Sequence, residues 1–241
     1  MGMAHKVFLA QSLHLKKPIK RKGSSFFLWR LFLLYDYHFK INHFLYKRNC
    51  PARELAMTKQ KLVEMLCRIS FQHNDLPVFK LAAGGTSKFY VNCRPTMLSP
   101  EGMRLAGRLV FDSIADLNVS GVGGLTFGAD PIAIATAFVS GLEKRPIKAF
   151  SIKKEKEAGA DWIEGDLKPG DRVAIIDDVA TTGGSTIKAI ERARLQGLDV
   201  ATAIILVDRQ EGGMENIRTH IPNAKALVTR TELMEHLGKT A

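Results

Sequence analysis

The sequence predicts an α/β fold with a central, mainly parallel β-sheet flanked by helices. Strand patterns alternate with helix patterns of about 10–15 residues, which is typical of successive βαβ units. Two strand patterns, 172–177 (RVAIID) and 200–208 (VATAIILVD), are apolar on both faces and therefore predict central, buried strands. Helix start and stop signals separate the two kinds of pattern.

The first predicted elements follow Met57. An amphipathic helix is expected from Met57 to about Ile69, where the composition of the chain changes sharply. The segment 78–94 (VFKLAAGGTSKFYVNCR) predicts two short strands around a Gly-Gly turn. Ser99 is predicted to cap the next helix, in which Pro100 takes the first position.

The later elements continue the alternation to the end of the chain. Asp130, followed by Pro131, is predicted to cap a helix, and Gly197 is a typical C-terminal stop. In order, the predicted elements are a strand at 119–125, a helix from Asp130 to about Gly141, strands at 147–152 and 172–177, a helix from Ser185 to Leu195, and strands at 200–208 and 224–229.

The basic charge of the chain is concentrated near its N-terminus. The 241 residues carry a formal net charge of +11. Residues 1–56 contain 11 Lys and Arg against 2 Asp and Glu, whereas residues 57–241 contain 24 against 22. We therefore expect a folded body, 57–241, preceded by a basic extension, 1–56, that is disordered or arises from a mis-assigned start.

Three explanations of the extension remain open. The first is that translation starts at Met57. The second is an organelle transit peptide, since the extension is rich in Lys and Arg and poor in acids. The third explanation is an arm that binds nucleic acid. The intact mass of the native protein separates the first explanation from the others, because a species that starts before Met57 contradicts it.

Cysteine usage and hydropathy exclude several classes of protein. Three widely spaced cysteines, Cys50, Cys67 and Cys93, fit neither a disulfide framework nor a zinc site, and they favour a reducing, cytoplasmic location. The longest apolar run, 26–34 (FFLWRLFLL), contains Arg30 and is shorter than the roughly 20 residues of a membrane span. We expect no membrane partner.

The segment 174–186 (AIIDDVATTGGST) carries the strongest chemical signal. Its apolar strand ends in Asp177 and Asp178, and a loop of glycine and hydroxyl residues then leads into a helix. Backbone N–H groups at a helix start bind phosphate, and glycine lets the phosphate come close. Carboxylates repel phosphate, so the two acids suit what lies beside it, namely sugar hydroxyls or Mg²⁺. The segment is neither a Walker A loop nor a GxGxxG loop.

In its order of residues, this segment resembles the donor-binding signature of type I phosphoribosyltransferases. Further segments resemble the orotate phosphoribosyltransferases among them, over some three quarters of the chain from about Met57 to Leu237. These segments are GGTSKFYVNCRP, VGGLTFGADPIA, KKEKEAGADWIEG and LVDRQEGG, in that order. The resemblance implies the type I phosphoribosyltransferase fold with a small N-terminal hood, and a catalytic domain at 57–241.

The resemblance also implies an activity. The family transfers ribose 5-phosphate from 5-phosphoribosyl 1-diphosphate to orotate, giving orotidine 5′-phosphate and diphosphate in pyrimidine (UMP) biosynthesis. The cofactor is Mg²⁺, held by Asp177 and Asp178 through water. By resemblance, donor contacts come from the whole segment Asp177, Asp178, Val179, Ala180, Thr181, Thr182, Gly183, Gly184 and Ser185.

Orotate carries a carboxylate, so its site needs a cation or backbone donors. Arg209 matches the family's orotate-binding arginine, and its planar fork suits a carboxylate. A surface arginine paired with Glu211 is the competing interpretation of Arg209. Thr181, Tyr90 and Val91 match further orotate contacts, although the two strand residues also fit simple core packing.

The charged segment 153–159 matches a loop that closes over the active site. In the family this loop reaches the diphosphate in the neighbouring subunit, which implies a homodimer. The expected catalytic cations are Lys153, Lys154 and Lys156. The carboxylate of Asp178 is also expected to be catalytic. Lys153 stands where the family usually has arginine, and Ala158 where it has histidine.

Two other functions remain open. A purine-specific type I phosphoribosyltransferase has the same donor loop, so only a substrate panel separates it from an orotate enzyme. The second is a phosphoribosyltransferase-like regulator that binds RNA through residues 1–56. The nearly neutral body argues against that reading, since nucleic-acid affinity depends on clustered Lys and Arg. We therefore expect no nucleic-acid partner.

Overall fold

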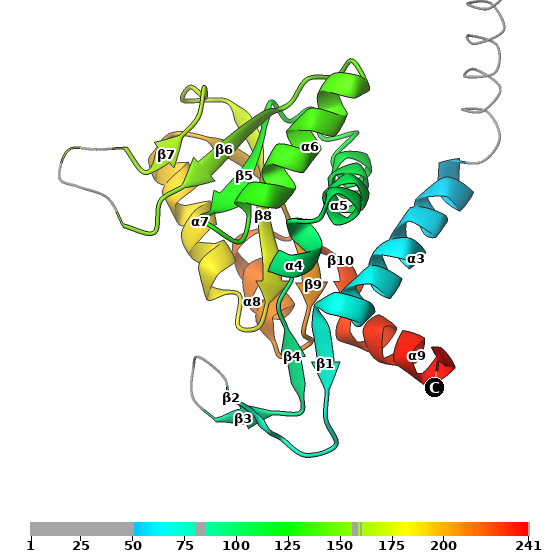
Figure 1. Ribbon diagram of the computed structural model, residues 1–241. Helices are drawn as coiled ribbons and strands as arrows, with labels where there is room; N and C mark the ends of the chain where they lie inside the picture. Colours follow the sequence, from blue (N-terminus) through cyan, green and yellow to red (C-terminus); the bar gives the residue numbers. More distant parts are fainter. Residues whose placement is uncertain (1–50, 81–84, 156–158, 160, 241) are drawn as a thin grey trace, which may run out of the picture. The chain divides into compact units, whose positions relative to one another are not determined.

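The computed structural model describes residues 51–80, 85–155, 159 and 161–240. Its main feature is a six-stranded sheet in the order β10-β9-β8-β5-β6-β7 (Figure 1). All neighbouring strands are parallel except β6 and β7, which are antiparallel. The strands are β5 (Gly121–Leu125), β6 (Lys148–Ile152), β7 (Ile163–Glu164), β8 (Arg172–Ala180), β9 (Asp199–Asp208) and β10 (Lys225–Thr229).

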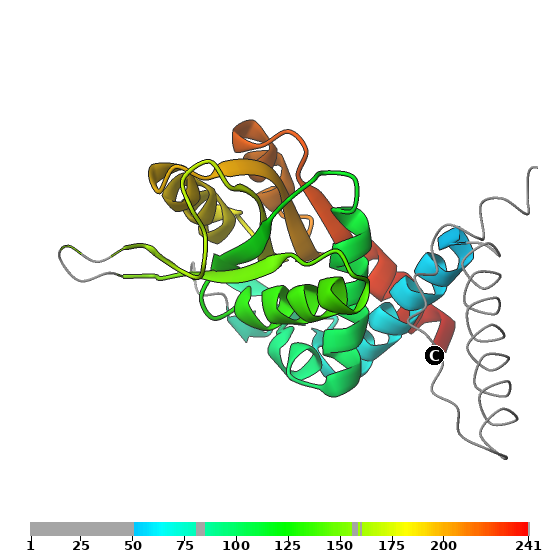
Figure 2. The same ribbon diagram turned by 90° about the horizontal axis from the view of Figure 1, so that it is seen from above.

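Helices cover both faces of this sheet. In Figure 2, the green helices α5 (Pro100–Ser113) and α6 (Asp130–Leu142) lie on one face, and the gold and orange helices α7 (Gly184–Leu195) and α8 (Gly213–His220) lie on the other. Successive residues of β8 therefore enter different cores: Ile175 packs with α7 and α8, and Ile176 with α5 and α6. This explains why the sequence of β8 is apolar at consecutive positions.

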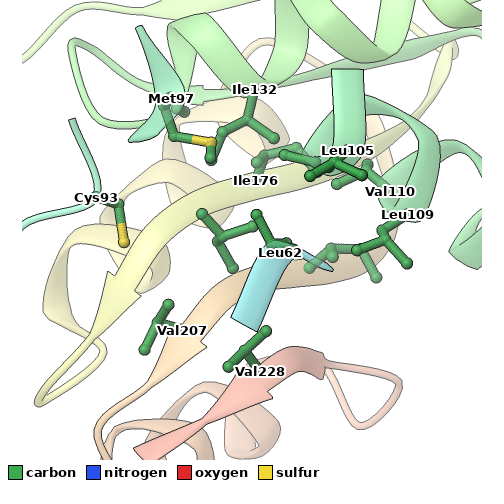
Figure 3. Packing of buried hydrophobic residues seen from close by; sticks show 14 of the residues in the cluster. Leu62, Cys93, Met97, Leu105, Leu109, Val110, Ile132, Ile176, Val207 and Val228 are labelled. Atoms are coloured by element: carbon green, nitrogen blue, oxygen red, sulfur yellow. The ribbon is translucent and has the colours of Figure 1, made fainter. Parts of the chain in front are cut away.

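A small hood precedes the sheet. It consists of α3 (Pro51–Ile69), β1 (Phe71–His73), β2 (Phe79–Lys80), β3 (Thr86–Ser87), β4 (Phe89–Val91) and α4 (Arg94–Met97). β1 pairs with β4 and β2 pairs with β3, both antiparallel. Leu62 of α3 lies in the same apolar core as Leu105 of α5 and Ile176 of β8 (Figure 3).

The last helix, α9 (Arg230–Thr240), packs beside α3. Lys59 Nζ lies 2.6 Å from Glu232 Oε1, and the Cys67 thiol donates to the Leu233 carbonyl at 3.4 Å. Leu233 is fully buried in the core that contains α3. Helix α9 thus holds α3, and with it the hood, on the body of the domain. The periodicity of the sequence did not predict this contact.

The predicted fold class and the main strands are confirmed. The predicted cap at Ser99 is also confirmed, since its hydroxyl accepts a hydrogen bond from the Gly102 amide at 3.1 Å. The predicted cap at Asp130 is wrong: Ala129 is the N-cap, and the Asp130 carboxylate instead accepts from Thr126 Oγ1 at 2.6 Å.

Some boundaries differ from their predicted positions. α3 begins at Pro51, upstream of Met57, so no change of secondary structure accompanies the change of composition. β8 continues through both acids to Ala180. Its pairing with β9 extends as far as Ala180 and Asp208, and this backbone pairing keeps the polar residues in the strand.

Candidate active site

The predicted site residues gather at the carboxyl ends of the parallel strands. β5 and β8 are neighbours in the sheet, yet the chain leaves β5 through α6 toward β6 and leaves β8 through α7 toward β9. Such a reversal of strand order opens a crevice in which ligands bind in open α/β sheets. The segment 177–185 lies at this point, and Lys153 and Arg209 follow the neighbouring strands β6 and β9 (Figure 1).

The loop between β8 and α7 is shaped by its glycines. Gly183 is the N-cap of α7 with a φ of 82°, and a Cβ there would lie 2.7 Å from the Gly213 carbonyl oxygen. Asn216 of α8 donates to the Thr182 carbonyl at 3.0 Å, which holds the loop from the outside. The amides at the start of α7 are therefore fixed in a position that favours an anion.

The two acids of β8 have different environments. Asp177 is buried, and its Oδ2 accepts from Ser185 Oγ at 2.6 Å and from Thr186 Oγ1 at 2.8 Å. Asp177 thus braces the start of α7 from within the protein. The Asp178 carboxylate is half-buried and accepts from the Val179 amide at 3.0 Å. Asp178 is therefore the acid that remains available to a ligand.

The strand-end loop after β5 approaches Asp178 closely. A Cβ added to Gly128 would lie only 2.7 Å from Asp178 Oδ1. Glycine at this position therefore leaves room for the carboxylate. Burial, and then the negative charge of Asp177, raise the pKa of Asp178 to about 6 from its ordinary value of 3.8.

This raised pKa predicts a pH-dependent stability. Between about pH 4 and 6 the folded state binds more protons at Asp178 than the unfolded state, so the unfolding free energy falls as pH rises through this range. Asp178→Asn removes the effect. Urea denaturation at about pH 4.5 and about pH 7.5 should show the variant gaining stability relative to wild type at the higher pH. If the difference in unfolding free energy between variant and wild type is the same at both pH values, the raised pKa of Asp178 is contradicted.

The residues at this point fit a hydrated metal ion better than one bound directly. A cation beside Asp178 would relieve the repulsion between the two acids that raises the pKa of Asp178. One oxygen of Asp177 already accepts two hydroxyl hydrogen bonds. Within the described part of the chain, no group of three or more His, Cys, Asp or Glu residues could enclose a metal. An ion here would need most of its ligands from water or substrate.

Arg209 is buried, so its interpretation as a surface residue is wrong, although its pairing with Glu211 is present. Its Nη2 donates to Glu211 Oε1 at 3.0 Å and to Ser87 Oγ at 3.3 Å, and its amide donates to the Ala180 carbonyl. Its Nε is buried and has no hydrogen-bond partner among the described residues. Glu211 also lies 3.7 Å from Arg230, so two cations share one carboxylate and the cluster stays positive.

The hood places its predicted residues near Arg209. Arg209 Nη2 lies 3.5 Å from the Phe89 carbonyl oxygen, next to Tyr90 and Val91 in β4. Tyr90 is exposed and stacks on Phe79, whereas Val91 is half-buried against the main core. Thr181 is half-buried at the end of β8.

The predicted loop cations are only partly described. Lys153 Nζ pairs with Glu164 Oε1 at 3.0 Å, so this ammonium is held at the hairpin formed by β6 and β7. Lys154 is exposed, and no carboxylate in the described ranges pairs with its ammonium. Lys156 and Ala158 lie outside the described residues.

Sequence reasoning missed three residues that shape the site. Thr186 binds Asp177 from within α7, and Arg192 reaches the backbone of Lys153 and Lys154. Trp162 stacks on Arg192. The adjacent hydroxyl residues Ser185 and Thr186, directly after the glycines of the donor loop, could have revealed Thr186. No local signal connects Arg192 with residues so far away in the sequence.

Known proteins similar to this chain include several orotate phosphoribosyltransferases. No family model matches the chain. An orotate phosphoribosyltransferase of Aquifex aeolicus is 43% identical over 165 residues, which cover 68% of this chain and 90% of the relative. The Mycobacterium tuberculosis orotate phosphoribosyltransferase, solved in complex with 5-phospho-α-D-ribosyl 1-diphosphate, has a TM-score of 0.60 and 32% identity, covering 73% of this chain and 91% of that chain.

A second solved structure agrees with these relatives. The orotate phosphoribosyltransferase of Aeropyrum pernix has a TM-score of 0.61 and 29% identity, covering 73% of this chain and 98% of that chain. Sequence similarity and fold thus agree over nearly the whole length of the relatives. The chain belongs to the orotate phosphoribosyltransferase family.

Proposed function

We propose that the chain transfers ribose 5-phosphate from 5-phosphoribosyl 1-diphosphate to orotate, giving orotidine 5′-phosphate and diphosphate. One observation carries the proposal: the available carboxylate of Asp178, an anion-binding helix start and the buried cation Arg209 all lie at the carboxyl ends of the neighbouring strands β8 and β9. The donor has a phosphate and ribose hydroxyls, and the acceptor has a carboxylate. Each of these groups finds a complementary partner at the site.

The donor loop has a division of roles in this proposal. The backbone of 179–185 and the Thr181 and Thr182 hydroxyls bind the 5-phosphate. Asp178 accepts from the ribose hydroxyls and from the water shell of the ion. Asp177 is proposed to act less directly, since its Oδ2 already holds Ser185 and Thr186.

Mg²⁺ is the proposed cofactor, held by Asp178 and Asp177 through water. When bound, it supplies positive charge to the diphosphate leaving group. Lys154, Lys153 and Lys156 are proposed to add positive charge from the loop 153–159. The need is greatest in the transition state, when charge develops on the departing diphosphate.

We propose a homodimer in which this loop reaches the neighbouring site. An apolar stripe on α6 supports an interface: Ile134, Phe138 and Leu142 recur at helical spacing and are 57%, 69% and 68% exposed. Exposed apolar groups that gather on one helix face mark protein-binding surfaces. A second copy of the chain is the partner that the proposed loop arrangement requires.

The remaining assignments are proposals of the same kind. The catalytic domain is proposed to span 57–241, with residues 1–56 as an extension, and the enzyme is proposed to be cytoplasmic. No helix in the described ranges is long and apolar enough to cross a membrane. Nucleic acid is not a proposed partner.

Orotate consumption, followed by its ultraviolet absorbance with the diphosphate donor and Mg²⁺, tests the proposed reaction. The panel includes hypoxanthine and adenine in place of orotate. Of the three acceptors, we expect only orotate to be turned over. We expect this turnover to be lost when the metal is chelated. Turnover with a purine but not with orotate would overturn the assignment. Salt-dependent RNA binding that disappears when residues 1–56 are deleted would instead support an RNA-binding regulator.

Arg209→Lys is expected to raise the KM for orotate about 10- to 100-fold, because lysine loses the bidentate contact with a carboxylate. The KM for the diphosphate donor should change much less. Steady-state kinetics with each substrate varied in turn measures both values. Arg104→Lys, an exposed change on α5, is the matched control. Equal increases in both KM values would mean that Arg209 maintains the whole site and is not an orotate contact.

A further inference from the structure

Arg192 is a buried cation for which the proposed reaction has no direct use. It lies in the last turn of α7 and is only 6% exposed. Within the described part of the chain, no carboxylate forms an ion pair with it, and its guanidinium instead lies 3.7 Å from the centre of the Trp162 ring. A desolvated cation over an indole ring is a favourable contact.

The same guanidinium binds the backbone where the predicted loop begins. Its Nη2 donates to the Lys154 carbonyl at 2.9 Å, and its Nη1 donates to the Lys153 carbonyl. The Lys153 amide in turn donates to the Trp162 carbonyl at 2.9 Å. Arg192 therefore contacts two carbonyls directly after β6 and an aromatic ring directly before β7.

These contacts join two parts of the site. α7 begins at Gly184, where its amides face the proposed phosphate position, and Arg192 follows about two turns later on the same rigid helix. The backbone at 153–154 is thus fixed to the element that starts the phosphate cradle. A buried charge is a weak source of stability, since an apolar side chain of similar volume often serves as well. We therefore explain this arginine by the fixed position that it gives to the backbone, and not by a gain in stability.

We propose that Arg192 is a positioning residue that fixes the backbone of Lys153 and Lys154 relative to the phosphate-binding start of α7. The Lys154 side chain then approaches the diphosphate group from a backbone whose position is fixed. Lysine cannot replace this arginine, because the planar fork serves two carbonyls and a ring at once. The inference rests on the role of Lys154 in the proposed function.

Arg192→Met keeps the length and apolar stem of the side chain and removes its donors. We expect kcat/KM for the diphosphate donor to fall about 10- to 100-fold, as for a small misplacement of a catalytic group. Arg192→Lys should restore little of the loss. Arg194→Met is the matched control on the same helix, because Arg194 binds the His220 carbonyl and is expected to keep wild-type kinetics. Thermal unfolding of all three variants identifies any loss of fold.

A double-mutant cycle separates positioning from a general structural role. If Arg192 acts through Lys154, then Arg192→Met should change kcat/KM by less than about threefold in a Lys154→Ala background. The same fall in both backgrounds would overturn the inference. A normal rate for Arg192→Met, together with an impaired Lys154→Ala, also overturns it and leaves the proposed function intact. A normal rate for Lys154→Ala would instead contradict the proposed function.

Trp162 offers a spectroscopic readout that is independent of activity. The chain has two tryptophans, so in a Trp29→Phe background the tryptophan emission comes from Trp162 alone. We expect Arg192→Met to change its emission and to increase quenching by acrylamide, while Arg194→Met leaves both unchanged. Unchanged emission and quenching in Arg192→Met would show that the stacked contact is absent in solution, and this result would overturn the inference even if Arg192→Met is poorly active.

Discussion

Lys154→Ala is expected to lower kcat about 100- to 1,000-fold, which is the usual cost of removing one group that stabilises charge in a transition state. Its ammonium is exposed and has no carboxylate partner in the described ranges, whereas Lys153 is already paired with Glu164 at 3.0 Å. We therefore expect Lys153→Ala to have a smaller effect. Initial rates at saturating substrates measure both changes.

The control for Lys154 is Lys168, an exposed lysine near the amino end of β8 and thus away from the site. Lys168→Ala should turn over orotate at the wild-type rate. If Lys154→Ala does so as well, Lys154 is not part of the catalytic machinery. A fall in kcat without a large rise in KM would instead place its contact in the transition state.

Asp178→Asn is expected to lower kcat/KM for the diphosphate donor about 100-fold or more, which is the usual scale of losing one preorganised group that stabilises charge in the transition state. The change keeps the size of the side chain and its ability to accept from the Val179 amide. It removes the negative charge, which the proposed contacts with ribose hydroxyls and the hydrated ion require. Rates should be measured across a range of Mg²⁺ concentrations.

Asp199→Asn is the matched control, because Asp199 lies at the amino end of β9 and is half exposed in an ion pair with Arg172. It should have the wild-type rate at every Mg²⁺ concentration. An Asp178→Asn enzyme as active as this control would show that the site has been misplaced. Greater stability of Asp178→Asn at neutral pH, combined with lost activity, would show that the buried charge serves function at the expense of stability.

The two variants together test the proposed exchange of loops between subunits. Co-expression with two different tags allows purification of heterodimers that combine one Lys154→Ala subunit with one Asp178→Asn subunit. If the loop acts in the neighbouring site, one of the two sites in each heterodimer is intact, and about half of the wild-type rate should return. No recovery would mean that both residues act within a single subunit, and the proposed arrangement would be wrong.

Much of the fold could be predicted from the sequence because its signals are local. Ser99 followed by Pro100 indicated a helix start, and the apolar pattern of β8 and β9 indicated buried parallel strands. Short elements such as β1 and β7 could not be predicted in this way. Each has two or three residues, too few for a periodic pattern, and each forms because a distant strand supplies its hydrogen bonds.

For the site, the sequence by itself determined its chemistry. The order of acids, glycines and hydroxyl residues in 174–186 indicated a sugar phosphate beside a metal, since these preferences belong to the side chains and the backbone loop itself. The sequence did not distinguish the two acids. They are adjacent in β8, and alternate residues of a strand point to opposite faces.

Only the tertiary structure decided which acid stays available and what holds the loop. Asp177 is turned toward hydroxyls of α7, whereas Asp178 is half-buried beside Gly128. Arg192 meets Trp162 and Lys154 only because α7 packs near the end of β6. Such contacts join residues that are distant in sequence, and they exist only after the sheet has brought its strand ends together.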